Sequence, residues 1–347
     1  MSSIKVSDLI VSTLAKHGIK TCFSVTGGGS MHLNHSFSVN KKIDVIYNHH
    51  EQASSIAAES YYRLNNKLCA LNVTSGPGGT NAITGVYGAF VDSIGMIVLS
   101  GQVKLETTVS ASEVPLRQLG DQELDIVPVI RSITKFSKMI TRVSDVLYDL
   151  EKAIYLAKSG RPGPCWLDIP LDIQGAMIDL KKIKRFNPPI TKENKKLLNK
   201  QVTEVISLIK KSKRPVIYCG SGIRLSERHL HFLKLVNLLN IPVVSSFNSQ
   251  DVIWENHRLY IGKAGTVGDR AGNFAVQNSD LLLVLGSRLN IRQVSYNYQM
   301  FAREAKIVWV DVDKTELDKH TVKPHLKIHK DLAIFLPSMI QKIKHKI

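Results

Sequence analysis

Residues 45–60, VIYNHHEQASSIAAES, place an acidic residue, Glu51, between a short apolar segment and a helix-like pattern. Residues 45–47 have strand character, and apolar and small residues recur at helical spacing over residues 53–60. We therefore expect Glu51 at a strand-to-helix junction, where ligands commonly bind in parallel α/β sheets. There its carboxylate would be half buried and able to share a proton with a weakly basic ring nitrogen. The alternative is that Glu51 only stabilises the start of its helix through the helix dipole.

Short apolar segments alternate with helical patterns on both sides of this stretch. In the first half we expect strands at residues 22–25, 68–73 and 96–99, and helices at residues 6–14 and 143–157. In the second half we expect strands at residues 215–218, 242–244, 281–285 and 307–312, and a helix at residues 230–239. This alternation predicts an α/β protein made of two doubly wound parallel-sheet domains.

The boundary between the two domains is expected where hydrophobic periodicity stops. Residues 187–189 (NPP) and 192–196 (KENKK) interrupt it with prolines and charge. We predict a first domain at residues 1–180, a linker at 181–200 and a second domain at 201–347.

Composition agrees with two folded cores and argues against a nucleic-acid partner. The 347 residues are 44% hydrophobic, and 46 Lys and Arg against 29 Asp and Glu give a formal charge of +17. The cations are dispersed without interleaved aromatic residues, so a solvated surface is expected. No segment approaches the about 20 apolar residues of a membrane span, and the first residues are polar. We expect no membrane partner, no leader and a cytoplasmic location.

The cysteines and histidines do not have the spacing of a metal site. Cys22, Cys69, Cys165 and Cys219 stand far apart and are expected to be small core residues rather than zinc ligands or disulfides. The histidines near Glu51 lack an acid or cysteine at ligand spacing. No metal site is therefore predicted on this chain.

Several loop and turn motifs follow the expected strands of the first half. They are Gly27-Gly28-Gly29, His50-Glu51, residues 74–81 (TSGPGGTN), Asp92-Ser93, residues 100–103 (SGQV), Gln122-Glu123, residues 131–135 (RSITK) and residues 159–164 (SGRPGP). Through these motifs, residues 6–174 resemble the N-terminal, pyrimidine-binding domain of thiamine-diphosphate enzymes of the acetolactate synthase type.

The resemblance implies roles for particular residues. Glu51 would activate thiamine diphosphate by hydrogen-bonding its aminopyrimidine ring and favouring the imino tautomer, which then takes the thiazolium C2 proton. Gln122 matches a family glutamine near the reacting centre, and Gln102 would lie in a loop that helps to close the site. The other residues expected to contact the cofactor are Gly27, Gly28, Gly29, Ser75, Gly76, Pro77, Gly78 and Asn81.

Residues 199–336 resemble the central, Rossmann-like domain of the same enzymes, mainly through residues 262–273, 279–282 and 286–288. In acetolactate synthases this domain holds FAD, whereas in many relatives it holds no nucleotide. Gly265, Thr266, Gly286 and Arg288 would suit a flavin phosphate or ribose, since glycine admits close backbone approach and Arg offers a forked set of donors. The alternative is that these residues only close turns and that Arg288 forms a salt bridge.

The family's third domain, which binds the diphosphate through Mg²⁺, has no counterpart in the sequence. Its Gly-Asp-Gly motif does not occur, and the single Asn-Asn pair, Asn65-Asn66, lies in the wrong region. We therefore expect Mg²⁺ to be held by a missing domain or a partner. Three explanations stay open: a truncated product, a separate chain that carries the missing domain, or a scaffold without catalysis. A homo-oligomer, either dimer or tetramer, is the other expected assembly.

With the site completed, the resemblance implies decarboxylation of a 2-oxo acid such as pyruvate and carboligation of the acyl unit to a carbonyl acceptor. Two residues depart from the family pattern: Thr26 replaces a proline, and Asp121 replaces a phenylalanine beside Gln122. A carboxylate at position 121 would disfavour an anionic acceptor, so a neutral aldehyde or keto sugar is our hypothesis. The competing classes are an inactive scaffold and a nucleotide- or flavin-binding module formed by the second domain.

Overall fold

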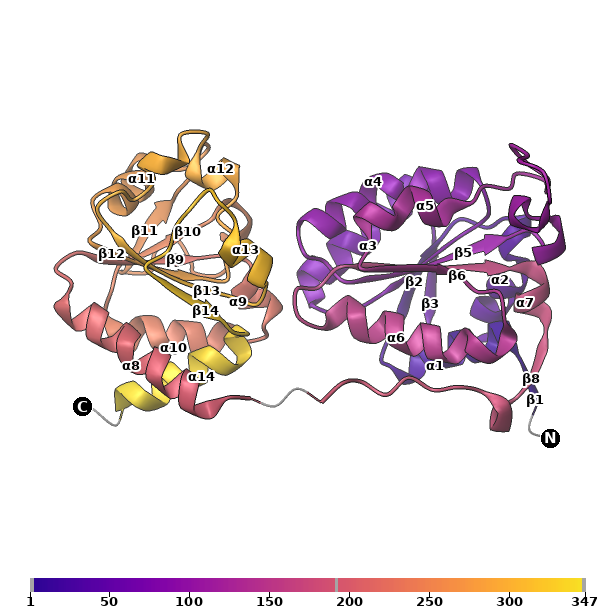
Figure 1. The fold of residues 1–347 in the computed structure, drawn as a ribbon, viewed down its shortest axis with the longest axis horizontal. Helices are drawn as coiled ribbons and strands as arrows, with labels where there is room; N and C mark the ends of the chain where they lie inside the picture. The colour runs from indigo at the N-terminus through magenta and orange to yellow at the C-terminus, as the bar shows by residue number, and fades with distance from the viewer. Residues whose placement is uncertain (1–2, 191–192, 345–347) are drawn as a thin grey trace. The chain divides into compact units, whose positions relative to one another are not determined.

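The structure, a computed structural model, describes residues 3–190 and 193–344. The chain divides into two compact units, Met1–Ile190 and Thr191–Ile347. Each unit contains one six-stranded parallel sheet with helices on both faces (Figure 1). The predicted α/β class with two doubly wound parallel sheets is confirmed. Among the described helices, none is both long enough and apolar enough to cross a membrane.

The first unit alternates strands and helices along most of its length. Its strands are β1 (Ser3–Lys5), β2 (Thr21–Ser24), β3 (Asp44–Tyr47), β4 (Ala70–Val73), β5 (Met96–Gln102), β6 (Phe136–Met139), β7 (Pro164–Pro170) and β8 (Met177–Asp179). Its α-helices are α1 (Val6–Lys16), α2 (Met31–Val39), α3 (Glu51–Asn65), α4 (Pro77–Val91), α5 (Ile126–Ile130), α6 (Val146–Lys158) and α7 (Leu171–Gly175).

The strand order of the first sheet, β3-β2-β4-β5-β7-β6, creates a site at one edge. From β2 the chain runs outward to β3 and then returns past β2 to β4, so the winding reverses between β2 and β4. Open α/β sheets bind ligands at such a reversal, beyond the carboxyl ends of the strands. Helices α3, α4 and α5 cover one face of the sheet, and α1 and α6 cover the other (Figure 1). Strands β1 and β8 form a separate antiparallel pair.

Helix α3 begins at the predicted junction because its first turn is capped. The Nδ1 atom of His50 accepts a hydrogen bond from the Gln52 backbone N–H at 3.1 Å. Asn66 ends the helix in the left-handed conformation, with φ of 53°. Glu51 therefore occupies the first turn, where the helix dipole favours negative charge.

Helices α3 and α4 approach each other closely at Gly85. An ideal Cβ atom at Gly85 would lie 2.4 Å from Ser55 Oγ and 2.7 Å from the Ile56 nitrogen. Such distances leave no room for a side chain, so the spacing of these helices requires glycine at this position.

The second unit repeats the alternation with its own sheet, in the order β11-β10-β9-β12-β13-β14. Its strands are β9 (Pro215–Cys219), β10 (Val243–Ser245), β11 (Tyr260–Lys263), β12 (Leu281–Leu285), β13 (Lys306–Asp311) and β14 (Leu326–His329). Its α-helices are α8 (Lys195–Lys211), α9 (Gly222–Leu225), α10 (His229–Leu239), α11 (Arg270–Gln277), α12 (Ile291–Val294), α13 (Lys314–Asp318) and α14 (Leu332–Lys344).

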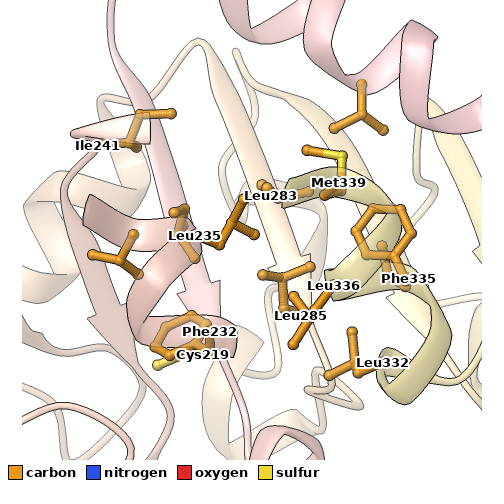
Figure 2. Close-up of a cluster of buried hydrophobic side chains, with 14 of the residues drawn as sticks. Cys219, Phe232, Leu235, Ile241, Leu283, Leu285, Leu332, Phe335, Leu336 and Met339 are labelled. Carbon is orange, nitrogen blue, oxygen red and sulfur yellow. The ribbon is translucent and has the colours of Figure 1, made fainter. Parts of the chain in front are cut away.

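Side chains of β12 alternate between two apolar clusters, as the two-residue period of a strand requires. Leu283 and Leu285 belong to a cluster with α10 and α14, whereas Leu282 and Val284 belong to the cluster on the other face. Figure 2 shows the first cluster, in which Phe232 and Leu235 of α10 and Leu336 and Met339 of α14 surround the strand. Burial on both faces explains why residues 281–285 are continuously apolar.

The strands and helices expected from the sequence are present, with small shifts at their ends. The four cysteines are buried and free, as predicted. Within the predicted linker, Lys184 Nζ lies 2.8 Å from Asp145 Oδ1, and the ring centroids of Phe186 and Tyr148 are 5.6 Å apart. Residues 184–186 therefore pack on the first unit. The domain bounds of 1–180 and 201–347 stay a prediction.

Gly85→Ala is expected to destabilise the first unit, although alanine is the better helix former by about 1 kcal/mol. The added Cβ must push α3 away from α4, and overpacking of this kind costs about 1–3 kcal/mol. Gly88→Ala is the matched control in the same helix, because its Cβ would meet only the flexible end of Glu59, at 3.0 Å. Thermal unfolding followed by circular dichroism should give a lower Tm for Gly85→Ala only. Equal Tm values for the two variants would contradict the close approach.

Candidate functional site

The segments that follow β2, β3, β4 and β5 bring most of the predicted site residues to one edge of the first sheet. The glycine turn at residues 27–29 follows β2, Glu51 follows β3, and the turn at residues 74–81 follows β4. Gln122 comes from the long loop between β5 and α5. Parallel strands end at the same edge, so these segments can meet there.

The glycine turn after β2 packs against the turn after β4. The Gly29 N–H donates a hydrogen bond to Thr74 Oγ1 at 3.0 Å. An ideal Cβ would lie 2.5 Å from Thr74 Cβ at Gly27 and 2.7 Å from Ser75 Oγ at Gly29, so neither position has room for a side chain. At Gly28 the same test finds no atom within 4 Å. The backbone of Gly28 is therefore the part of this turn that a ligand can approach.

Glu51 is buried more deeply than the sequence suggested, since only 8% of it is exposed rather than half. Asn81 Nδ2 donates to its Oε2 at 3.1 Å, from a position one turn after the exposed Pro77 that starts α4. The other oxygen, Oε1, lies 3.6 Å from the Cβ position of Gly78. It accepts no hydrogen bond from the part of the chain that the structure describes. Because His50 supplies the capping hydrogen bond of α3, the Glu51 carboxylate is left for another partner.

Gly76 joins the turn after β4 to the loop that carries Gln122. Gly76 has φ of +54°, and a Cβ there would lie 2.0 Å from the Gln122 carbonyl oxygen. Gln122 has φ of +53°, which is uncommon for a residue with a side chain. Both Gln122 and its neighbour Asp121 are exposed. The structure therefore places them at the site edge, and the acceptor preference assigned to Asp121 stays a prediction.

The expected position of Gln102 was wrong. It is the last residue of β5 rather than part of a loop, and it is 1% exposed. Its Nε2 donates to the Leu124 carbonyl at 2.8 Å and to Asp168 Oδ2 at 3.1 Å, while its Oε1 accepts from the Val103 N–H at 3.0 Å. The Gln102 amide uses both its nitrogen and its oxygen in hydrogen bonds within the protein. Gln102 therefore ties the loop after β5 to strand β7.

Asp168 is a buried titratable group that sequence reasoning missed. Its side chain, on β7, accepts hydrogen bonds from Ser100 Oγ and Gln102 Nε2, and Trp166 Nε1 donates to Ser100 Oγ at 2.7 Å. Burial raises the pKa of Asp168 to about 7. Hydrogen bonds from Ser100 and Gln102 lower it, and the nearby charge of Asp125 raises it further. The sequence feature that could have indicated Asp168 is the single acidic residue within the otherwise apolar residues 164–170.

The candidate flavin residues of the second unit fall into two groups. Gly265 and Thr266 line a pocket of about 170 Å³, together with residues that include Gln293. Pockets for drug-sized ligands measure about 300–1,000 Å³, so this pocket would hold only part of a nucleotide.

Gly286 and Arg288 lie outside that pocket. Gly286 has φ of +61°, and its Cβ position is 2.8 Å from Gly222 Cα, so this glycine lets the turn after β12 pack against the start of α9. Arg288 forms no salt bridge with any described residue. The alternative that Arg288 serves only in a salt bridge is therefore not supported. Nearby, Asn290 Oδ1 is buried without a hydrogen-bond partner in the described ranges.

Comparison with known proteins agrees with this arrangement. Residues 4–128 match the family "Thiamine pyrophosphate enzyme, N-terminal TPP binding domain", and residues 202–339 match "Thiamine pyrophosphate enzyme, central domain". The chain is similar to the chloroplastic acetolactate synthase of Arabidopsis thaliana, with 33% identity over 99% of this chain and 50% of the relative. It is also 33% identical to the acetolactate synthase large subunit of Lactococcus lactis, over 96% of this chain and 56% of the relative.

The chain belongs to the thiamine pyrophosphate enzyme family, of which it carries the N-terminal TPP binding domain and the central domain. It is similar to the acetolactate synthases named above and spans about half the length of the curated relatives it matches. The family predicted from the loop motifs is thereby confirmed.

Asp168 is expected to make the stability of the first unit depend on pH. Its pKa is raised from 3.8 to about 7 in the folded state, so the folded state retains a proton that the unfolded chain releases between these values. The contribution is complete below about pH 3.8 and is lost as the pH rises through about 7. Within this window the slope approaches about 1.4 kcal/mol per pH unit.

Urea unfolding followed by hydrogen exchange of the β7 amides measures this slope for the first unit. Asp168→Asn should remove it, whereas Asp44→Asn, an exposed carboxylate on β3, should leave it unchanged. An unchanged slope in Asp168→Asn would show that another group is responsible.

Proposed function

We propose that this chain supplies the pyrimidine-binding half of an active site that decarboxylates a 2-oxo acid such as pyruvate and ligates the acyl unit to a carbonyl acceptor. The observation that carries the proposal is the Glu51 carboxylate. It is buried at the start of α3, with one oxygen held by Asn81 and the other beside Gly78 and free of hydrogen bonds from the described residues.

The residues at this edge suit an aminopyrimidine ring. A buried carboxylate is costly unless its oxygens are satisfied, and a protonated ring nitrogen or an amino group of the ligand would donate to Oε1. Gly28 offers open space above its backbone, and Gly78, beside Glu51 Oε1, adds no side chain of its own next to the carboxylate. These features support binding of a flat ring between the glycine turn and α3.

Each protein group has a separate part in the proposed mechanism. Thiamine diphosphate, once bound, supplies the electron sink for decarboxylation. Glu51 Oε1 would hold a proton at a pyrimidine nitrogen, and Asn81 would orient the carboxylate by fixing Oε2. Gln122, exposed on the loop after β5, would face the substrate. The loop itself would exclude water from the reacting carbon.

The site would need a second domain, which binds the diphosphate. We propose that a diphosphate-binding domain, for example on a separate chain, holds the diphosphate and Mg²⁺, and that this chain also assembles as a homo-oligomer, either dimer or tetramer. The four cysteines are all buried and free, which supports a reducing compartment such as the cytoplasm.

Calorimetry and turnover with a completed site test the proposal. The chain is mixed with thiamine diphosphate and Mg²⁺, with and without the C-terminal half of the Lactococcus lactis acetolactate synthase large subunit supplied separately. We expect tight cofactor binding and release of CO₂ from pyruvate only in the mixture. Absence of both would favour the scaffold alternative.

In the active mixture, Glu51→Gln should lower turnover by about 10²–10⁴-fold, which is the usual contribution of a general acid or base. Glu59→Gln, an acid on the same helix that pairs with Arg63, is the matched control and should retain turnover. Undiminished turnover in Glu51→Gln would remove the assigned role.

As a second candidate function, we propose that the carboxyl edge of the second sheet binds a flavin nucleotide. Two observations favour it: the Arg288 guanidinium has no acidic partner among the residues described, and Asn290 Oδ1 is buried and unsatisfied. Arg288 could pair with a phosphate, and Asn290 could accept from a ribose hydroxyl or ring N–H. The pocket at Gly265 and Thr266 would take a further part of the ligand.

Purified protein saturated with FAD should show protein-bound flavin absorbance after gel filtration. Arg288→Ala should lose most of that flavin, since a charge-assisted hydrogen bond contributes about 1.5–3 kcal/mol. Arg303→Ala removes a surface guanidinium that lies beside Glu304, and this variant should keep the bound flavin. Absence of bound flavin in the unmodified protein would leave the second sheet with a packing role.

A further inference from the structure

We propose that Glu123 is a positioning residue for Gln122, because its carboxylate fixes the tight turn from which Gln122 reaches the site. This inference rests on the proposed function, which makes Gln122 a residue of the active site. Neither the fold nor the family match assigns a role to Glu123.

The Glu123 carboxylate is buried among backbone N–H groups of its own loop. It is 6% exposed, and its Oε2 accepts from the N–H groups of Leu119 and Gly120, each at 3.0 Å. Its Oε1 accepts from the N–H of Val109, fourteen residues earlier. No Lys or Arg pairs with it in the part of the chain that the structure describes. Three backbone donors therefore satisfy the charge, and they close the loop around it.

The same residue holds both ends of the turn that contains Gln122. The Glu123 N–H donates to the Gly120 carbonyl at 3.2 Å, which closes a four-residue turn with Asp121 and Gln122 at its centre. The Glu123 carboxylate also accepts from the Gly120 N–H, so Glu123 binds both the carbonyl and the N–H of Gly120. Gln122 is thereby held at φ of +53°, a left-handed conformation that is uncommon for a residue with a Cβ.

The turn is fixed to the rest of the site at two further points. The Gln122 carbonyl lies against Gly76, in the turn that leads into α4. The Leu124 carbonyl accepts from Gln102 Nε2 at 2.8 Å, and Gln102 is bound to Asp168 in the sheet. With the residues on both sides anchored, the exposed side chains of Asp121 and Gln122 are left to project from the turn.

Replacing Glu123 by Gln tests charge and geometry at nearly constant size. An NH₂ group would face backbone N–H donors at one of the two oxygen positions, so at least one of the hydrogen bonds must break. Glu123→Asp retains the charge and is one methylene shorter, so it should rescue part of the effect. Glu113→Gln, an exposed acid in the same loop, is the matched control.

Hydrogen exchange of the full chain tests whether the carboxylate holds the loop, independently of activity. We expect the amides of Val109, Leu119 and Gly120 to exchange faster in Glu123→Gln, with intermediate rates in Glu123→Asp and unchanged rates in Glu113→Gln. Unchanged protection of these three amides in Glu123→Gln would overturn the inference, whatever the turnover.

A double-mutant cycle in the completed assembly tests whether Glu123 acts through Gln122. Glu123→Gln should lower kcat by about 10- to 100-fold, as expected when a group is misplaced by about 1 Å. Combined with Gln122→Ala, it should cause no further loss, because the two effects share one cause. Losses that multiply would overturn the inference while the proposed function stands. If the unmodified assembly neither binds thiamine diphosphate nor turns over pyruvate, the proposed function fails instead, and the exchange measurement still decides whether Glu123 holds the turn.

Discussion

The candidate site depends on close approaches between turns at which only glycine fits. Gly76, at positive φ, lies against the carbonyl of Gln122, and the glycine turn after β2 lies against Thr74 and Ser75. A Cβ atom at Gly76, Gly27 or Gly29 would separate the turns that follow neighbouring strands. The glycines therefore let three turns converge where the winding of the sheet reverses, which is where an open α/β sheet binds its ligand.

Three carboxylates at or behind this edge are buried, and the hydrogen bonds that they accept come from neutral groups. Glu51 accepts from Asn81, Glu123 accepts from backbone N–H groups, and Asp168 accepts from Ser100 and Gln102. A buried charge is costly without hydrogen bonds, and neutral donors compensate it less strongly than a cation would. Asp168 shows the consequence, since burial outweighs its hydrogen bonds and raises its pKa to about 7. The Asp168 carboxyl can therefore hold or exchange a proton near neutral pH.

Sequence reasoning succeeded where the signal was local and failed where polar residues were satisfied by a distant strand. The junction at Glu51 was predicted because the strand, the cap and the helix are consecutive. The end of β5 was placed too early because Ser100 and Gln102 are polar, although they pair with Asp168 and Pro170 of β7 inside the sheet. The burial of Glu51 was underestimated for a similar reason, because Asn81 and Gly78 come from the next helix.

The sequence by itself determined the two parallel-sheet units and the family, and it predicted the approximate position of the candidate site. Periodicity, glycine positions and loop motifs are local properties of a chain, and they specify which segments become strands and where the turns fall. Only the tertiary structure decided that Glu51 Oε2 rather than Oε1 accepts from Asn81, that Gly28 faces free space, and that Gln102 is buried and bonded to the loop after β5. Those features depend on atoms from segments far apart in the chain, because hydrogen-bond partners and excluded volume exist only once the segments have been packed together.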